Sequence, residues 1–289
     1  MSDINFDLFK CRCSSIHKAL ANSRSNPVLT EKQSIRLSEL ETKASLTDKT
    51  REELAELLIK KQNITKVVLS DTYIEYLMEW YSWHTTGKVP VSKETMYINY
   101  VEKGKDVEDD SITLLSLVEG EIHEKNEERI QNDYLSGIPD IYTGKSIMQA
   151  KKIKDIKSSW DYPGFLKKIH SANSNGNDLQ LKGYMDITGA PEAEIVHCLV
   201  NTPERIKYDL RGYLLKKMNV ISEESPEFLS AYDELARSMD FDDIPIHKRV
   251  FKIKVDQFSE FQRQQVYDRV KVGREWLWNF HEMYEMLNL

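Results

Sequence analysis

The chain has 289 residues, of which 40 are Lys or Arg and 47 are Asp or Glu, so its formal net charge is −7. Hydrophobic residues make up 40% of the sequence, and 11 Gly and 8 Pro are too few for a fibrous or disordered chain, so we expect one or two globular domains. The sequence has neither a long apolar run nor a signal-peptide start, which predicts a cytoplasmic protein with no membrane partner. Three cysteines are too few for a disulfide framework or a four-thiolate metal site.

The first hundred residues are predicted to be mostly helical. Thr50 and Glu53 have the spacing of a capping box, and leucines follow at helical period, which predicts a helix over residues 50–62. A second helix is predicted between Ser70 and Gly87. Aromatic residues recur on one face of this second helix, and we interpret that face as a core contact rather than a stacking platform for nucleic-acid bases.

The middle of the chain changes from helix to extended segments. A helix is predicted over residues 104–118, with Glu108 in its first turns, because acidic residues favour the positive end of the helix dipole. Residues 129–142 and 147–157 suit extended chain, and the four residues between them have turn chemistry. The sequence therefore predicts a β-hairpin.

After the hairpin, helices alternate with two strands, so the order is a helical region over residues 1–99 followed by a mixed α/β core over residues 100–289. We expect a central mixed sheet flanked by helices. The remaining predicted elements are a short helix opened by Pro163 and Gly164, a helix over 179–188, a buried strand over 193–201, helices over 203–218 and 226–239, a strand over 249–255 and a long helix from residue 257.

Acidic side chains converge at the predicted hairpin. Asp155 and Lys157 project from the same face of a strand while Ile156 faces the other way, because side chains alternate along a strand. Asp140 can lie opposite them across the hairpin, and Glu108 can approach from the helix beneath. At ~4 Å and an effective dielectric constant near 20, each pair of carboxylates repels by about 4 kcal/mol, so the cluster requires protonation or a cation. Oxygen ligands favour Mg²⁺ or Mn²⁺.

A hard cation beside a lysine indicates one kind of chemistry. The cation lowers the pKa of a bound water molecule and polarises a phosphoryl oxygen, while a nearby ammonium can position the water and stabilise the anionic phosphorus. The residues therefore predict hydrolysis of phosphodiester bonds.

The same residues carry a resemblance to a known family. Residues 137–140 (Gly-Ile-Pro-Asp), followed after fourteen residues by residues 155–157 (Asp-Ile-Lys), are similar to the signature of PD-(D/E)xK nucleases. Upstream, Gly104 and Glu108 look like the G-x-x-x-E helix of lambda exonuclease and of YqaJ-type viral recombination nucleases. The resemblance implies a restriction-endonuclease-like core preceded by a helical extension.

A fourth motif lies downstream of the hairpin. Gln180 and Tyr184 resemble the Q-x-x-x-Y motif of the RecB-like nuclease branch, and their i, i+4 spacing puts both side chains on one helical face. The four motifs occur in the family's order within residues 100–205, and together they are more specific than any one alone.

The resemblance implies a role for each matched residue. Asp140 and Asp155 would ligate the main ion together with the carbonyl of Ile156, and Lys157 would orient the attacking water. Glu108 would ligate an ion directly or through water, so one or two Mg²⁺ ions are expected, with Mn²⁺ able to substitute. The last motif, Gln180 and Tyr184, would position the lysine or the DNA backbone.

Charge is distributed unevenly around these motifs. Residues 102–129 hold ten acids and four bases, whereas residues 144–170 hold seven lysines and two aspartates. The basic segment flanks Asp155, although a solvated surface explains any one of its lysines equally well. The candidate phosphate contacts are Lys145, Lys151, Lys152, Lys154, Lys167 and Lys168.

The N-terminal region departs from the family pattern. In lambda-type exonucleases this region supplies an arginine and a serine that hold the 5′ phosphate of the recessed strand. Ser70 is the candidate serine here, but no arginine stands at the matching distance upstream, and lysines such as Lys60, Lys61 or Lys66 would lack the bidentate guanidinium. The resemblance therefore leaves the cleavage polarity open.

The function implied by the resemblance is 5′–3′ exonuclease activity on linear duplex DNA in phage-type recombination or DNA processing. Such an enzyme makes tails for a single-strand annealing protein, forms a homo-oligomer such as a ring trimer, and acts in the cytoplasm of a bacterium or of a phage-infected host. Two alternatives are an endonuclease of the same fold that cuts internally or at specific structures, and a noncatalytic DNA-binding or adaptor protein.

Two histidines are assigned no function. His123 stands among Glu119, Glu121 and Glu124, where we expect an exposed, charged helix end rather than a metal cluster. His197 lies beside a cysteine in a predicted buried strand, and adjacent strand residues face opposite ways, so the two are not a nucleophile pair.

Overall fold

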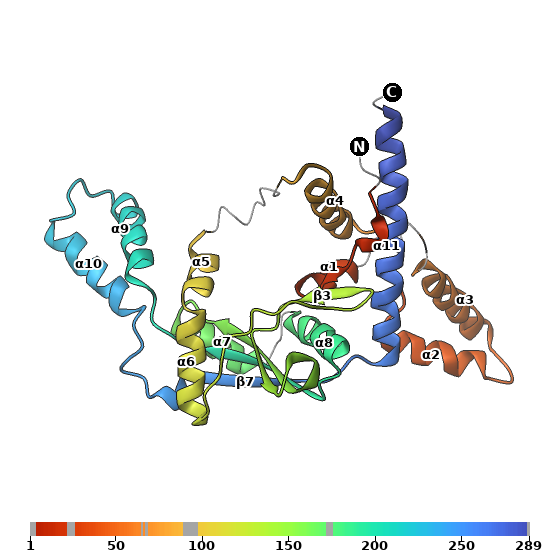
Figure 1. Ribbon diagram of the computed structural model, residues 1–289, viewed down its shortest axis with the longest axis horizontal. Coiled ribbons are helices and arrows are strands. Elements are labelled where there is room, and N and C mark those ends of the chain that lie inside the picture. The colour runs from red at the N-terminus through yellow and green to blue at the C-terminus, as the bar shows by residue number, and fades with distance from the viewer. Residues whose placement is uncertain are drawn as a thin grey trace.

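A long C-terminal helix stands beside a small mixed sheet (Figure 1). The helix is α11, and α4 and α1 lie on one side of it while α2 and α3 lie on the other. The helical pair α9 and α10 forms the opposite end of the molecule. The computed structural model describes residues 4–21, 27–64, 66, 69–88, 98–171 and 176–287.

Most of the helices predicted from the sequence are present in the structure. Within the described residues, none of them is long and apolar enough to cross a membrane. The helices are α1 (Ile16–Ala19), α2 (Glu31–Glu41), α3 (Asp48–Asn63), α4 (Asp71–Thr86), α5 (Ile98–Asp106), α6 (Glu108–Glu119), α7 (Tyr162–Ser171), α8 (Asn177–Thr188), α9 (Glu204–Met218), α10 (Pro226–Arg237) and α11 (Glu260–Leu287).

The strands form two sheets. The larger sheet has the order β4-β5-β6-β7, in which β5 pairs antiparallel with β4 and parallel with β6, and β6 pairs antiparallel with β7. The smaller sheet has the order β1-β3-β2. The strands are β1 (Cys11–Arg12), β2 (Ile130–Gln131), β3 (Leu135–Gly137), β4 (Ile141–Gly144), β5 (Ala150–Ser158), β6 (Glu192–Cys198) and β7 (Val250–Val255).

The predicted capping of α3 is wrong by three residues. Thr47, not Thr50, is the N-cap, and its hydroxyl oxygen accepts a hydrogen bond from the Thr50 backbone N–H. Glu53 does not turn back on the helix start but pairs with Arg36 of α2 at 2.9 Å. A tertiary ion pair has therefore replaced the local contact. The capping of α4 is as predicted, with Ser70 before it and Gly87 in the left-handed region after it.

The helix predicted over residues 104–118 is broken at Val107. α5 ends at Asp106 and α6 begins at Glu108, while the Val107 side chain is buried against Ile141 and Ile156. α5 has an anchor of its own: the side chain of Lys103 is buried, and its Nζ donates a hydrogen bond to the carbonyl of Trp160 at 2.9 Å. The break therefore makes Glu108 the first residue of a helix.

The predicted hairpin forms from β4 and β5, but the extended segment before it is interrupted. Residues 130–137 belong to the smaller sheet, in which β2 and β3 pair antiparallel. The chain turns between these two strands, where the Asn132 side-chain oxygen accepts hydrogen bonds from the backbone N–H groups of Tyr134 and Leu135. β3 then pairs with β1, a strand that the sequence did not predict.

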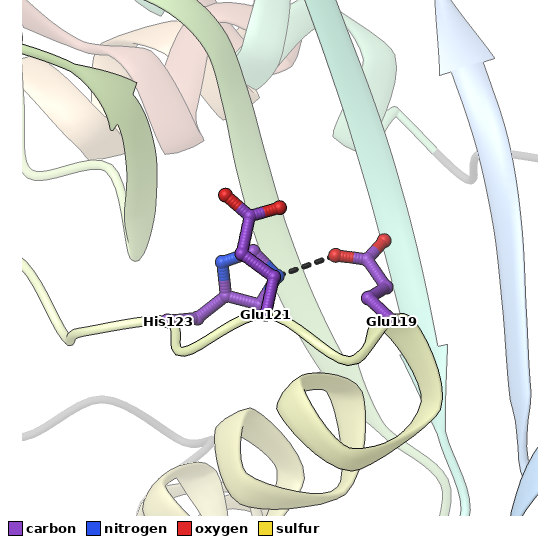
Figure 2. Close-up of side chains that lie close together, drawn as sticks. All are labelled: Glu119, Glu121 and His123. Carbon is purple, nitrogen blue, oxygen red and sulfur yellow. Dashed lines mark hydrogen bonds and ion pairs between the residues drawn. The ribbon is translucent and has the colours of Figure 1, made fainter.

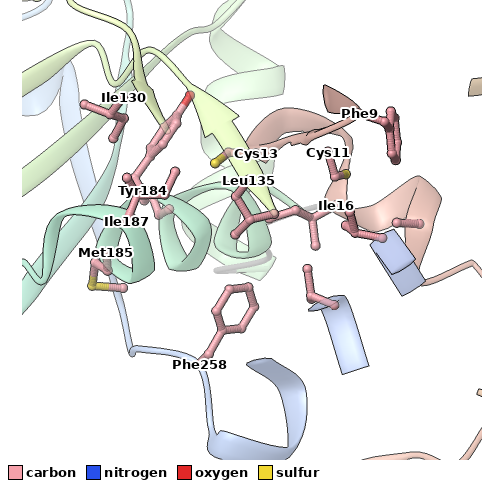
Figure 3. Close-up of a cluster of buried hydrophobic side chains, with 14 of the residues drawn as sticks. Phe9, Cys11, Cys13, Ile16, Ile130, Leu135, Tyr184, Met185, Ile187 and Phe258 are labelled. Atoms are coloured by element: carbon pink, nitrogen blue, oxygen red, sulfur yellow. The ribbon is translucent and has the colours of Figure 1, made fainter. Parts of the chain in front are cut away.

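The main core joins the two ends of the chain. Phe9, Cys11, Cys13 and Ile16 of the N-terminal segment pack with β3, α8 and the start of α11 (Figure 3). Residues on both sides of the predicted boundary at 99/100 thus share one hydrophobic cluster. The three cysteines are buried and free.

Gly273 tests the packing of α4 on α11. A Cβ at Gly273 would lie 2.5 Å from the hydroxyl oxygen of Tyr73, which is fully buried and donates to the Arg269 carbonyl at 2.9 Å. Gly273→Ala is expected to lower the free energy of unfolding by about 1–3 kcal/mol through overpacking. Urea unfolding followed by circular dichroism measures the change.

Gly212 of α9 is the matched control, because nothing lies within 4 Å of its added Cβ. Gly212→Ala should stabilise the protein by up to ~1 kcal/mol through helix propensity. Equal effects of the two substitutions would contradict the packing described for α11.

Candidate active site

The central strand β5 carries a buried carboxylate beside a lysine. Asp155 is 0% exposed, and the Lys157 Nζ lies 2.6 Å from its Oδ2. The two side chains share a face because they are two residues apart on a strand, as predicted. The Lys157 side chain is 32% exposed, so the pair has one buried end and one end open to solvent.

Asp140 reaches the same place from the start of β4. Its Oδ2 accepts a hydrogen bond from the backbone N–H of Ile156 at 2.6 Å. Asn126 fixes the turn before it, because the Asn126 backbone N–H donates to the Asp140 carbonyl at 2.8 Å and its Nδ2 donates to the Pro139 carbonyl at 2.9 Å. Asn126 is buried and was not predicted, since no local pattern marks a residue that acts across a loop.

Helix α8 supplies two further polar groups. Gln180 Nε2 donates to Asp155 Oδ1 at 2.9 Å and lies 3.0 Å from the Tyr184 hydroxyl, which donates to the Ile138 carbonyl at 3.0 Å. The i, i+4 spacing thus brings Gln180 and Tyr184 together on the face that meets β5. The approach is close, because a Cβ on Gly137 would lie 2.4 Å from the Tyr184 ring.

Glu108 lies at the edge of this group. Its carboxylate pairs with Lys125 Nζ at 3.2 Å, and its charge raises the pKa of Asp140, Asp155 and Lys157. Lys125 stands in the loop after α6 and also contacts Asp109 at 3.5 Å. The ion pair with Lys125, which the sequence did not predict, holds Glu108 beside the other acids.

The surroundings of Asp140 and Asp155 disfavour the ionised form of both carboxyl groups. Burial, followed by the charge of Asp155, raises the pKa of Asp140 to about 7. Burial also raises the pKa of Asp155, although Lys157 opposes the shift. Burial alone would lower the pKa of Lys157, but the carboxylates of Asp155 and Asp140 outweigh it and raise that pKa. Lys157 is therefore an ammonium at neutral pH.

The donor set fits a hard divalent cation. Asp140, Asp155 and Glu108 offer carboxylate oxygens, and the Ile156 carbonyl belongs to the same strand segment. The raised pKa values of the two aspartates mean that a positive charge placed among them would favour their ionised forms. Oxygen-only ligands suit Mg²⁺ or Mn²⁺ better than Zn²⁺.

A second group of acids has the spacing of a metal site (Figure 2): the ligand atoms of Glu119, Glu121 and His123 lie within 4.8 Å of one another. The Glu119 carboxylate is already bound by His123, Lys154 and Lys252. Protein cations thus neutralise this group. The prediction that His123 lies on an exposed helix end is wrong, because His123 is buried by these contacts.

The candidate phosphate contacts divide into three sets. Lys154 is 3% exposed and bound to Glu119, so the prediction of a surface contact at this residue is wrong. Lys152 pairs with Glu192 and Glu194 at 3.1 Å. The surface lysines are Lys145 and Lys151 at the turn end of the β4–β5 hairpin and Lys167 and Lys168 on α7, of which Lys168 is half-buried.

The N-terminal segment borders the site in a way that the sequence did not predict. Cys13 packs against α8, where a Cβ on Gly183 would lie 2.9 Å from its Sγ. Arg12 and Ser14 on either side of Cys13 are exposed. Ser70, in contrast, is buried and its hydroxyl oxygen accepts from the Tyr73 N–H at 3.3 Å as the cap of α4.

The fold is shared with exonucleases. A phage-related exonuclease from Haemophilus somnus 129PT matches with a TM-score of 0.59 and 20% identity, over 95% of this chain and 96% of the other. An alkaline exonuclease (LHK-Exo) from Laribacter hongkongensis matches with a TM-score of 0.53 and 11% identity, over 96% of this chain and 93% of the other. LHK-Exo in complex with dAMP matches with a TM-score of 0.51 and 12% identity, over 98% and 94%.

No protein-family model and no curated protein matches the chain. The likeness to the exonucleases therefore concerns the fold, and it confirms the predicted α/β architecture with a mixed sheet flanked by helices.

Substitution of Asp140 tests the electrostatics of the site. A carboxyl group whose pKa is higher in the folded protein binds more protons there than in the unfolded chain, so stability falls as pH rises from about 3.8 to about 7. Asp140→Asn keeps an acceptor for the Ile156 N–H and removes this penalty. Without divalent cations, the melting temperature of the variant relative to the natural protein is expected to be higher at pH 8 than at pH 5.

The same measurement with Mg²⁺ supplies the complementary result. A cation that binds the folded state alone raises the melting temperature. The rise should be larger at pH 8 than at pH 6 and absent in Asp140→Asn. A melting difference independent of pH would contradict the raised pKa of Asp140.

Proposed function

We propose that this protein is a metal-dependent nuclease of the PD-(D/E)xK type that hydrolyses phosphodiester bonds in DNA. One observation carries the proposal: Lys157 and Gln180 both contact Asp155 at one end of β5, and Asp140 is bonded to the backbone N–H of Ile156 between them. An oxygen-rich cation site beside an ammonium is the arrangement that phosphodiester hydrolysis requires.

Each residue has a role that its position supports. Asp140, Asp155 and the Ile156 carbonyl would hold the cation, with Glu108 as a further ligand directly or through water. The bound cation supplies a water molecule of lowered pKa and polarises the phosphoryl oxygen. Lys157, as an ammonium, donates to the attacking water or to a phosphate oxygen and stabilises the charge that develops on phosphorus.

Gln180 and Tyr184 position these groups. Gln180 holds the Asp155 oxygen that Lys157 does not contact, and Tyr184 ties α8 to the turn before Asp140 through the Ile138 carbonyl. The pKa of Tyr184 is raised by burial, so its hydroxyl remains a donor.

The substrate proposed is linear duplex DNA attacked from an end, with Mg²⁺ as the ion and Mn²⁺ as a substitute. The structural neighbours are named as exonucleases, and one of them is recorded with dAMP, a nucleotide of the kind that cleavage at an end releases. A 5′–3′ polarity requires a site for the terminal phosphate, and the exposed Arg12 and Ser14 beside α8 are better placed for it than the buried Ser70.

The cellular setting follows from the same proposal. Assembly as a homo-oligomer such as a ring trimer, a single-strand annealing protein as partner, and action in the cytoplasm during phage-type recombination all accompany an exonuclease of this type.

Matched linear and covalently closed circular duplexes test the proposed activity. With Mg²⁺, degradation of the linear form alone is expected, and EDTA should abolish it. Asp155→Ala and Lys157→Ala should each lower kcat by at least about 100-fold, because each removes a charge that acts at the reacting phosphate.

Lys254→Ala is the matched control for Lys157→Ala, since Lys254 is exposed on β7 away from the acids and should leave activity unchanged. Cleavage of both DNA forms would indicate an endonuclease. No cleavage in any tested divalent metal, with folded protein, would favour a noncatalytic DNA-binding protein.

Salt dependence tests the lysines on α7. Each phosphate contact contributes about −0.9 to the slope of log K against log salt concentration for duplex DNA. The double variant Lys167→Ala/Lys168→Ala is therefore expected to reduce the slope by about 2, measured by fluorescence anisotropy of a labelled duplex in Ca²⁺. An unchanged slope would show that these two lysines do not contact the DNA phosphates. Lys254→Ala again serves as the control.

A further inference from the structure

His197 lies directly beside Lys157 in the larger sheet. The two residues are paired in the parallel ladder of β5 and β6, so their side chains project from the same face of the sheet as Asp155. On its other side His197 is paired with Phe251 of β7, and the two rings stack with centroids 6.5 Å apart and planes 16° apart. The imidazole is thus held between the lysine and an aromatic ring.

The His197 ring is buried and incompletely bonded. It is 3% exposed, and its Nε2 has no hydrogen-bond partner among the described residues. A buried polar atom without a partner is uncommon in folded proteins and costs free energy. The unpaired Nε2 lies one strand away from the proposed catalytic lysine, so we looked for a group that could bond to it when the site is in use.

The electrostatic surroundings keep this ring neutral. Burial, followed by the charges of Lys168 on α7 and Lys157 on β5, lowers the pKa of His197 to about 4. A neutral imidazole has one nitrogen that accepts a hydrogen bond, and both of the neighbouring charged groups are donors. An ammonium is thus the natural partner for the free Nε2.

Lys157 has N–H groups that are available for further hydrogen bonds. Its ammonium carries three N–H groups, and the structure pairs it with one oxygen, Oδ2 of Asp155, whose carboxylate is also proposed to hold the cation. A carboxylate shared between a cation and a lysine holds the lysine less firmly than one that serves the lysine alone.

We infer that His197 is a positioning residue for Lys157, with its Nε2 accepting a hydrogen bond from the lysine ammonium when Asp155 is engaged by a cation. This inference rests on the proposed nuclease function and deepens it by naming the group that keeps the lysine directed at the phosphate.

Two substitutions separate this role from simple packing. His197→Phe keeps a ring that can stack on Phe251 but removes the acceptor, whereas His197→Gln loses the ring but places an amide oxygen near the position of Nε2. Positioning predicts that kcat falls about tenfold in His197→Phe with little change in KM, and stays within about threefold in His197→Gln. The reverse order, with Phe tolerated and Gln impaired, would assign His197 to packing and overturn the inference.

A measurement without turnover tests the contact itself. Long-range ¹H–¹⁵N spectra report the state of the His197 ring nitrogens, and addition of MgCl₂ is expected to shift the Nε2 signal in the natural protein. The shift should disappear in Lys157→Met and remain in Lys254→Met, which alters an exposed lysine on β7. A signal that does not respond to Mg²⁺, or that responds equally in Lys157→Met, overturns the inference.

The outcome for His197 can be distinguished from that of the nuclease proposal. Cleavage by the natural protein that is lost in Asp155→Ala supports the nuclease function whichever way His197 behaves. If the natural protein cleaves nothing, the nuclease proposal fails, and the Nε2 signal still decides whether His197 and Lys157 are in contact.

Discussion

The structure depends on one constraint, which is the complete burial of a carboxylate on an inner strand of the larger sheet. Asp155 is 0% exposed, with Asp140 beside it across the hairpin. Two carboxylates at about 4 Å repel by about 4 kcal/mol at an effective dielectric constant near 20. The lysine two residues along the strand and the amide of Gln180 offset part of this cost, and both approach from fixed elements.

The rest of the fold brings those compensating groups into contact. β4 and β6 flank β5, so that Asp140 and His197 lie on either side of the Asp155 and Lys157 face. α8 approaches closely because Gly137 and Gly183 leave room for Tyr184 and Cys13, respectively. The N-terminal segment and α11 pack on the far side of α8 and complete its burial. A site at one end of the sheet therefore draws on residues from nearly the whole length of the chain.

The sequence predicted the pairs of side chains that lie close together within one strand or one helix, and it did not predict contacts between elements that are distant in the chain. Strand alternation placed Asp155 with Lys157, and helical period placed Gln180 with Tyr184. Asn126 could not be predicted, because its hydrogen bonds reach across a loop to residues 139 and 140. The run of lysines around Lys154 makes it a candidate phosphate contact in the sequence, whereas Glu119 of α6 binds it inside the protein. An ion pair between distant elements leaves no periodic trace in the sequence.

A comparison of two acidic clusters among the described residues explains why one of them is proposed as a cation site. Glu119 lies under three groups that can carry positive charge, His123, Lys154 and Lys252, so its pKa is lowered to about 2 despite burial. Asp140 has a pKa raised to about 7, because burial and Asp155 outweigh the single lysine nearby. A cluster that the protein neutralises itself gains little from a metal ion. A cluster left with a deficit of positive charge gains stability from a divalent cation, and strongly shifted carboxyl groups of this kind gather at functional sites.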